Sequence, residues 1–235
     1  MPLLGIRIRH ATITRMKVLL WTILVIVLAI VGYFVYESLE MVPVVIAPPG
    51  SSATSTADIP VIIPGTPSVK YMDPQYGFDI YYPSTSTLRD GGFEGYLPLT
   101  QTPIIAFVLS PDLSAGTNLS EAGVYVGATS SPAMVSNCLS ARPNSGEIAA
   151  SSTIAISGMT FAQFDSTGAA AGSTYQEKIY RTLVGSSCLE FVELMHSSDI
   201  GNHPKSTVTP FDSAHISAIL DAMMDTLTFS APAQR

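Results

Sequence analysis

The longest apolar run of the chain lies near its N-terminus. Residues 18–36 read VLLWTILVIVLAIVGYFVY, without a charged side chain. As a helix, a run of this length spans roughly 28 Å, close to the hydrocarbon thickness of a bilayer. Trp21, Tyr33 and Tyr36 lie toward its two ends, where aromatic rings favour the membrane interface. The pattern predicts a transmembrane signal anchor over 18–36.

The charges around this run predict its orientation. Residues 1–17 hold four basic side chains and no acidic one, whereas all 18 acidic residues follow the run. The positive-inside rule then places 1–17 in the cytoplasm and the rest of the chain outside it, with the lipid bilayer contacted through 18–36. A cleaved signal peptide stays open as an alternative, with the nearest small-residue site at Ala47.

Residues 37–68 are rich in Pro, Ser and Thr. The six prolines of this stretch remove amide donors and fix backbone angles, so neither a helix nor a central strand is expected there. We predict that it is a tether, followed by a folded extracytoplasmic domain over 69–230 and a short tail over 231–235.

Apolar positions beyond Lys70 alternate or cluster over lengths typical of strands. Residues 78–82 alternate before a proline, and 103–110 form a continuous apolar run short enough for a buried strand. Gly185-Ser186 predicts a tight hairpin turn, and Ser131-Pro132 predicts the start of a short helix. The further predicted strands are 122–129, 153–156, 160–165, 175–184, 189–196 and 228–229.

The clearest helical signal lies near the C-terminus. Five apolar residues fall on one face at helical spacing: Ile216, Ile219, Leu220, Met223 and Leu227. Thr209 is the predicted N-cap and Pro210 the first helical residue. The predicted fold class is α+β: an N-terminal transmembrane helix, a Pro/Ser/Thr linker, and an antiparallel sheet with flanking helices that include this long C-terminal helix.

Three segments of this domain resemble motifs of the PsbP/Mog1-like domains. Residues 71–84, which end in YGFDIYYPS, resemble the family's opening motif, and residues 219–229, ILDAMMDTLTF, are similar to its closing motif. Residues 185–188 are similar to a Gly-x-x-Cys strand of bacterial single-span members, but the family's usual Trp after the Tyr-Pro pair is absent. The resemblance covers about residues 70–230. It implies a compact antiparallel sheet flanked by helices, used as a binding and assembly module without a shared catalytic constellation.

Charge excludes nucleic acid as a partner. Beyond residue 36 there are 7 basic and 18 acidic residues, so this part of the chain carries about −11. Such a domain lacks the basic surface that binding to phosphate backbones requires. No cofactor is predicted either, because glycine runs such as Gly91-Gly92 are too short for loops that cradle phosphates.

The two cysteines, Cys138 and Cys188, both lie in the part of the chain predicted to be extracytoplasmic. In oxidising surroundings an even pair predicts a disulfide, with two buried thiols as the alternative. A bridge that closes a loop of about 50 residues stabilises the fold by roughly 4 kcal/mol in the chain-entropy model.

Other candidate chemistry is weak. His196, Asp199 and His203 carry ligand types that metals use, but the Ser, Gly, Asn and Pro around them predict a solvated loop, so we predict no metal site. Glu190 and Glu193 lie an odd number of residues apart on one predicted strand and therefore point to opposite faces. We predict no catalytic residue.

The sequence thus favours a non-catalytic binding or accessory domain, anchored at the bacterial cell envelope, that binds a protein partner or scaffolds a complex. The alternative is an envelope hydrolase with a site near His196, Asp199 and His203. A concave pocket that converges on these side chains would favour the enzyme, and an exposed patch would favour the binding module.

Overall fold

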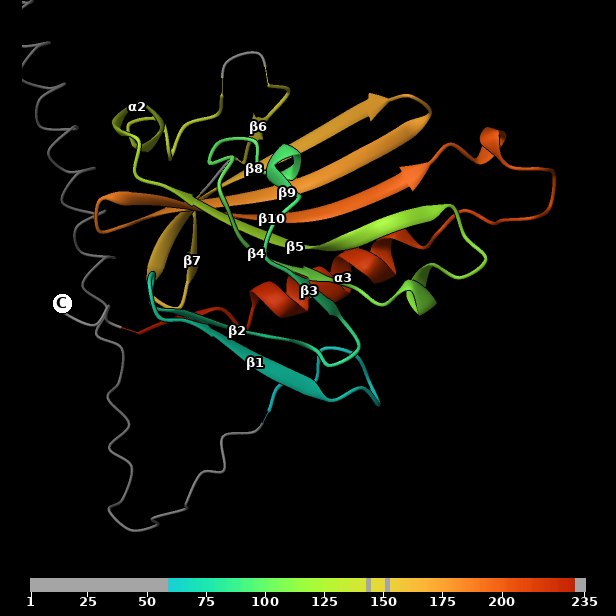
Figure 1. The fold of residues 1–235 in the computed structure, drawn as a ribbon, viewed down its shortest axis with the longest axis horizontal. Coiled ribbons are helices and arrows are strands. Elements are labelled where there is room, and N and C mark those ends of the chain that lie inside the picture. Colours follow the sequence, from blue (N-terminus) through green and yellow to red (C-terminus); the bar gives the residue numbers. More distant parts are fainter. Residues whose placement is uncertain (1–58, 143–144, 151–152, 231–235) are drawn as a thin grey trace, which may run out of the picture. The chain divides into compact units, whose positions relative to one another are not determined.

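β-Strands dominate the part of the chain described by the structure, a computed structural model that covers residues 59–142, 145–150 and 153–230 (Figure 1). The strands in chain order are β1 (Ser68–Asp73), β2 (Phe78–Pro83), β3 (Thr87–Arg89), β4 (Pro103–Val108), β5 (Leu119–Thr129), β6 (Ile148–Ala149), β7 (Ile154–Ile156), β8 (Met159–Ala170), β9 (Ser173–Val184), β10 (Ser187–Ser198) and β11 (Thr228–Phe229). The helical segments are the 3-10 turns η1 (Glu94–Tyr96), η2 (Pro111–Ser114) and η3 (Ile200–Asn202), and the α-helices α2 (Pro132–Val135) and α3 (Ser213–Met224).

The strands form two antiparallel sheets. The smaller sheet has the order β1-β2-β11, and the larger one has eight strands in the order β3-β4-β5-β10-β9-β8-β6, with β7 also paired to β8. The central pair, β5 and β10, joins segments far apart in the sequence, whereas β8, β9 and β10 follow one another directly. The large sheet is therefore an earlier run of strands, β3-β4-β5, joined through the β5–β10 pair to the β8–β9–β10 meander.

Two-residue turns make this meander. Ala171 and Gly172, between β8 and β9, both have positive φ, 51° and 78°. Gly185 begins the turn between β9 and β10 with a φ of 59°. Turns with positive φ at their first central residue match the twist of paired strands, which explains the long, regular hairpins. The hairpin turn that the sequence predicts at Gly185-Ser186 is present.

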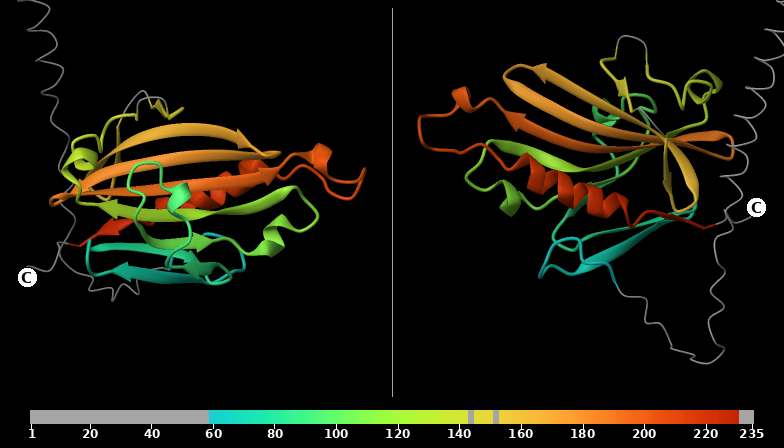
Figure 2. Two further views of the ribbon diagram at one scale, coloured as in Figure 1. Left: turned by 45° about the horizontal axis from the view of Figure 1, so that its top comes forward. Right: turned by 180° about the vertical axis from the view of Figure 1, so that it is seen from behind.

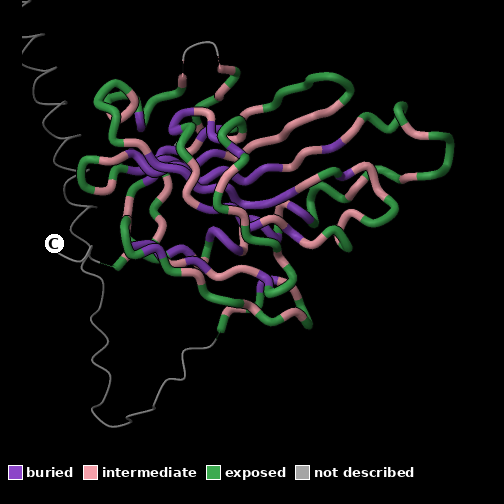
Figure 3. Tube along the Cα trace, viewed as in Figure 1, coloured by how far each residue is buried: buried purple, intermediate pink, exposed green. Residues whose placement is uncertain are grey.

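The two faces of the large sheet are covered differently. On one face, α3 lies between the large sheet and the small one, and their side chains share a core that includes Phe78, Phe191 and Leu220 (Figure 2). On the other face, the segment that contains η1 lays Phe93 and Leu97 over a second buried cluster. Burial is deepest where these layers overlap, and it decreases toward the turn between β8 and β9 (Figure 3).

The helix α3 begins later than the sequence predicts. Thr209 is not its cap, because the Thr209 amide donates to the Gly116 carbonyl and the Thr209 carbonyl accepts from the Asn118 amide. These bonds hold Thr209 in an extended bridge to Thr117. Asp212 caps the helix instead, and its carboxylate accepts from the His215 amide at 3.0 Å. The helix has 12 residues and buries the predicted apolar face.

The predicted α+β class is wrong. The described residues form 11 strands in two sheets and two α-helices, one of them a single turn over Pro132–Val135. The second layer over α3 is a small sheet rather than another helix, and the layer over the opposite face is a loop with one 3-10 turn. The described part of the chain is mostly β because strands and loops, not flanking helices, supply most of the covering side chains.

The predicted transmembrane helix over 18–36 lies outside the described residues. Within 59–142, 145–150 and 153–230, no helix combines the length and apolarity needed to cross a bilayer. The predicted signal anchor, bilayer contact and single-pass membrane location therefore find no support in the described residues. The linker and tail boundaries at 37–68 and 231–235 also fall largely or wholly outside the described residues.

Candidate functional site

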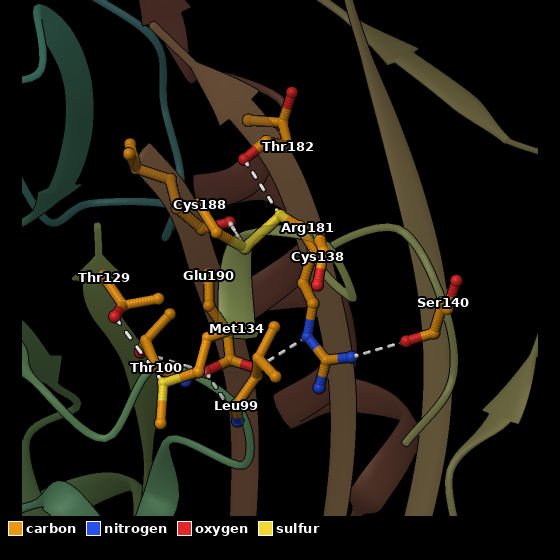
Figure 4. Close-up of a disulfide and its surroundings, with 12 residues drawn as sticks. Leu99, Thr100, Thr129, Met134, Cys138, Ser140, Arg181, Thr182, Cys188 and Glu190 are labelled. Atoms are coloured by element: carbon orange, nitrogen blue, oxygen red, sulfur yellow. Dashed lines mark hydrogen bonds and ion pairs between the residues drawn. A yellow bond between two sulfur atoms is a disulfide. The ribbon is translucent and has the colours of Figure 1, made fainter. Parts of the chain in front are cut away.

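One end of the large sheet is held by a disulfide. Cys138 and Cys188, the pair that the sequence predicts to be bonded, are joined with their Cα atoms 5.7 Å apart (Figure 4). Both are buried and pack against Leu99. Because α2 follows β5 directly, the bridge fastens the segment after β5 to the start of β10. The thiols are consumed in the bond, so this site has a structural role.

A buried ion network lies beside the disulfide (Figure 4). The Arg181 guanidinium donates to Glu190 at 2.7 Å and to both carboxylate oxygens of Glu147, at 2.6 and 3.0 Å. Glu190 also accepts from the backbone amides of Leu99 and Thr100. All three charged side chains are almost fully buried and paired. We call this region, with the disulfide, the cross-linked end. Its polar groups are saturated and therefore offer nothing to a ligand.

A second charged cluster faces α3. Lys178 on β9 pairs with Glu193 on β10 at 3.3 Å and with Asp221 on α3, and the Tyr180 hydroxyl donates to Glu193 at 3.1 Å. Burial raises the pKa of Glu193 to about 7, and Lys178 opposes this rise. A cavity of about 200 Å³ borders the cluster. Glu193 can therefore exchange a proton near neutral pH, at the joint between the helix and the sheet.

The residues of the alternative hydrolase site do not converge. His196 stacks on the Tyr175 ring with centroids 4.4 Å apart, whereas Asp199 accepts from the Gly201 amide and turns the chain into η3. His203 Nε2 lies 2.7 Å from the Ser198 hydroxyl, a pair that the sequence did not suggest. Among the described residues, no carboxylate is hydrogen-bonded to His203, and no group of three metal-ligating side chains is present. The Ser198–His203 pair therefore lacks the third group that orients a catalytic histidine.

A tyrosine-lined cleft lies at the other end of the sheet. It has a volume of about 400 Å³ and is lined by Tyr96 from η1, by Tyr175 and Glu177 from β9, and by small residues of β8. The Tyr96 and Tyr175 ring centroids are 6.4 Å apart. The pKa of Glu177 is raised above its usual value, mainly because burial disfavours the charged carboxylate. The cleft thus combines aromatic walls with one partly buried carboxyl group.

The edge of the sheet beside this cleft has no neighbouring strand among the described residues. β6 and β7 cover β8 at its first half, up to Asp165, and Ser166–Ala170 continues beyond them. Since the Gln163 carbonyl bonds outward to Ala150, alternation along the strand turns the backbone groups of Thr167 and Ala169 outward too. We call this edge, with the cleft, the open end.

Little in the sequence predicts this site. Tyr175 and Glu177 lie two residues apart and share a face, as a strand requires, but nothing in the sequence says that this face stays partly exposed. Tyr96 comes from a distant loop, and it reaches the cleft because Tyr125 supports its ring at 5.1 Å. Strand register and loop packing therefore create the cleft.

No family model and no curated protein matches the chain. Among solved structures, a protein of Bacteroides thetaiotaomicron aligns with a TM-score of 0.39 and 14% identity over 71% of this chain, which spans 50% of that protein. LpqN of Mycobacterium tuberculosis, described as involved in cell envelope biogenesis, aligns with a TM-score of 0.38 and 10% identity over 71% of this chain and 92% of its own. These structural likenesses are distant, neither protein is described as PsbP/Mog1-like, and TM-scores this low carry no argument about function.

Proposed function

We propose that this domain is a non-catalytic module that binds a protein partner through the open end of its large sheet. The observation that carries the proposal is the edge of β8 over Ser166–Ala170, with which no other described strand pairs and which lies next to the tyrosine-lined cleft. An extended segment of a partner can add to such an edge as a further strand, with backbone hydrogen bonds for affinity and a neighbouring pocket for specificity.

The side chains of this edge suit such an addition. Residues 166–170 read STGAA, without a charged or proline residue. Soluble proteins commonly protect an exposed edge with lysine, proline or a bulge, and none of these is present in this stretch. Small side chains also let a second backbone approach closely. The side chains of this edge therefore do not hinder the pairing of a further strand.

The disulfide is consistent with a partner met in an oxidising compartment. Disulfides persist in secreted and envelope proteins and are rare in the cytosol. The Cys138–Cys188 bond spans 50 residues, and Cys188 pairs with Leu183 near one end of β9, whereas Ser166–Ala170 pairs with the other end of that strand. It can therefore stabilise the scaffold without restricting the binding surface.

Site-specific photocrosslinking in living cells tests the proposal. A photoreactive residue at Ala169 of the full chain should give a discrete crosslinked protein, and the same residue at Leu88, on the opposite edge strand β3, should not. Thr167→Pro removes an outward amide donor from the open edge and should abolish the Ala169 product. Equal products from both edges, or a product from Ala169 that survives Thr167→Pro, would contradict the proposal.

A further inference from the structure

We propose that the cleft receives a cationic side chain, a Lys or Arg of an extended partner segment, against the wall formed by the Tyr96 and Tyr175 rings, with Glu177 as its counter-ion. This inference rests on the proposed strand addition and names the chemistry that such a partner must carry. It is supported by four separate features: an uncompensated carboxylate, two aromatic walls, a floor of small residues, and the charge of the domain.

The first feature is the missing cation at Glu177. No Lys, Arg or His of the described residues lies within ion-pair distance of its carboxylate. The two basic residues of the same strand, β9, are committed elsewhere: Arg181 to Glu190 and Glu147, and Lys178 to Glu193 and Asp221 on the opposite face of the sheet. A carboxylate that is partly removed from water is stabilised by an opposite charge nearby, and none of the described residues supplies that charge here.

The second feature is the pair of aromatic rings. Tyr175 is held by its stack on His196 at 4.4 Å, and Tyr96 is held edge-on to Tyr125 at 5.1 Å. Both rings are therefore fixed before a ligand arrives. A cation over the face of an aromatic ring gains roughly 0.5–2 kcal/mol, and such rings recognise ammonium groups when they line a pocket.

The third feature is room for a long side chain. On the face of β8 that carries the cleft, the residues are Ser166, Gly168 and Ala170, none of which projects far. The volume of about 400 Å³ is within the range of small-ligand pockets. A methylene chain can lie on this floor while its charged end reaches Glu177.

The geometry of strand addition also selects one side chain. Side chains of a strand alternate between the two faces, so a segment paired beside Thr167 and Ala169 points every second side chain toward the cleft. The residues between them point toward the face that carries α3. One basic residue, flanked by residues suited to strands, is therefore the minimal recognition pattern.

The fourth feature is the overall charge. Residues 59–230 contain 15 acidic and 6 basic residues, so this part of the chain carries −9 with neutral histidines. Such a field attracts basic segments and repels acidic ones, which raises the association rate with the proposed partner. An anionic ligand would meet Glu177 directly and is excluded by the same charge.

Binding of matched peptides to the full chain tests the inference. The probes are acetyl-Thr-Val-Lys-Val-Thr-amide and two analogues in which norleucine or glutamate replaces the lysine. We expect the lysine peptide to bind about 10-fold more tightly than the norleucine peptide, as an ion pair in a partly desolvated site predicts. Glu177→Gln should reduce that difference to the part that the two rings supply, and Glu177→Lys should favour the glutamate peptide. Glu94→Gln, at an exposed carboxylate on η1, should leave the difference unchanged.

Each other outcome overturns the inference in a recognisable way. If lysine and norleucine peptides bind equally and Glu177→Gln has no effect, the cationic ligand is wrong while strand addition stands. If no peptide binds but the Ala169 crosslink persists, the partner uses the edge without the cleft. If the chain forms dimers in sedimentation that Thr167→Pro dissociates, a second copy occupies the edge instead. Thermal unfolding of each variant, with a transition like that of the wild type, verifies that the protein is folded.

Discussion

β9 and β10 run through both ends of the large sheet, and the two ends differ in how their polar groups are satisfied. At the cross-linked end, Arg181 and Glu190 are fully buried and every charge has a partner. At the open end, six residues earlier on β9, Tyr175 is partly exposed and Glu177 lacks a cation among the described residues. The same pair of strands therefore changes from a saturated interior to a surface with unmet interactions.

In the proposed function, this difference separates the part of a small β domain that provides stability from the part that binds. Buried, fully paired networks and a disulfide fix one end, where no ligand reaches. The long strands then carry that rigidity outward, so the cleft is preorganised although it has few interactions of its own. A binding surface supported in this way loses little entropy when a partner arrives.

The largest expected effect comes from breaking the network of the cross-linked end. Arg181→Met should lower the free energy of unfolding by about 3–5 kcal/mol, because Glu147 and Glu190 would stay buried without a cation. Urea unfolding measures this change. Replacing all three side chains with neutral ones of similar size should cost less than Arg181→Met alone. A loss below about 1 kcal/mol in the single variant would mean that the two ends differ little.

The disulfide should contribute somewhat less. Cys138→Ser should lower the free energy of unfolding by about 2–4 kcal/mol, because the denatured chain gains the freedom of the opened loop. Cys188→Ser and the double variant should cost the same, since each removes one bond. Thermal unfolding of the three variants side by side provides the measurement. Labelling of two thiols in the unreduced, denatured wild type would disprove the bond.

A pH effect should appear at the joint between α3 and the sheet. The pKa of Glu193 rises from 4.5 to about 7 on folding, so the folded state binds this proton more tightly than the unfolded state. Its stabilisation is complete below pH 4.5 and is lost as the pH rises toward 7 and above. We therefore compare the unfolding free energy of the wild type with that of Glu193→Gln. The value for the wild type, relative to the variant, should fall by about 1–3 kcal/mol between pH 5 and 8.

The control for this pH effect is Asp225→Asn, which replaces an exposed carboxylate at the C-terminal end of α3. Glu193→Gln should change the slope of the unfolding free energy against pH more than this control does. A Glu193→Gln variant with the wild-type slope between pH 5 and 8 would show that Glu193 stays charged in the folded protein.

The smallest effect on stability is expected at the open end. Because the pKa of Glu177 is raised on folding, its charge costs stability at pH 8, and Glu177→Gln should be neutral or stabilising by about 0.5 kcal/mol. Guanidinium unfolding at pH 8 measures it. A clear loss of stability would make Glu177 a structural carboxylate, and the contrast between the two ends would fail.

Much of the strand pattern was predictable from the sequence, and the layers were not. Alternation and β-branched residues locate β2, β4 and β10, and Gly185 marks the turn between β9 and β10. The covering of the η1 face depends on Phe93 and Leu97, two apolar residues in a loop too short to show a period. Because the sequence does not reveal that this loop covers one face of the large sheet, it suggests that helices cover the sheet, and the α+β prediction fails for this reason.

The polar sites show the same limit. Alternation correctly separates Glu190 and Glu193 onto opposite faces, and the structure gives each its own cluster. Their partners depend on register, which sets Arg181 opposite Glu190 and Lys178 opposite Glu193. Register is decided by turns and by tertiary packing, so the pairing of these charges could not be predicted from a single strand.

The pairing of β5 with β10 also has a consequence for the order of folding. The β8–β9–β10 meander uses two-residue turns and can form from local contacts, whereas β5 must wait until β10 has been synthesised. Cys138 follows β5, and Thr129 at the end of β5 faces Cys188 across the ladder. The two thiols thus meet once this long-range ladder has closed. The rate at which the two free thiols disappear during oxidative refolding therefore measures how fast the β5–β10 ladder, the slowest contact of the sheet, forms.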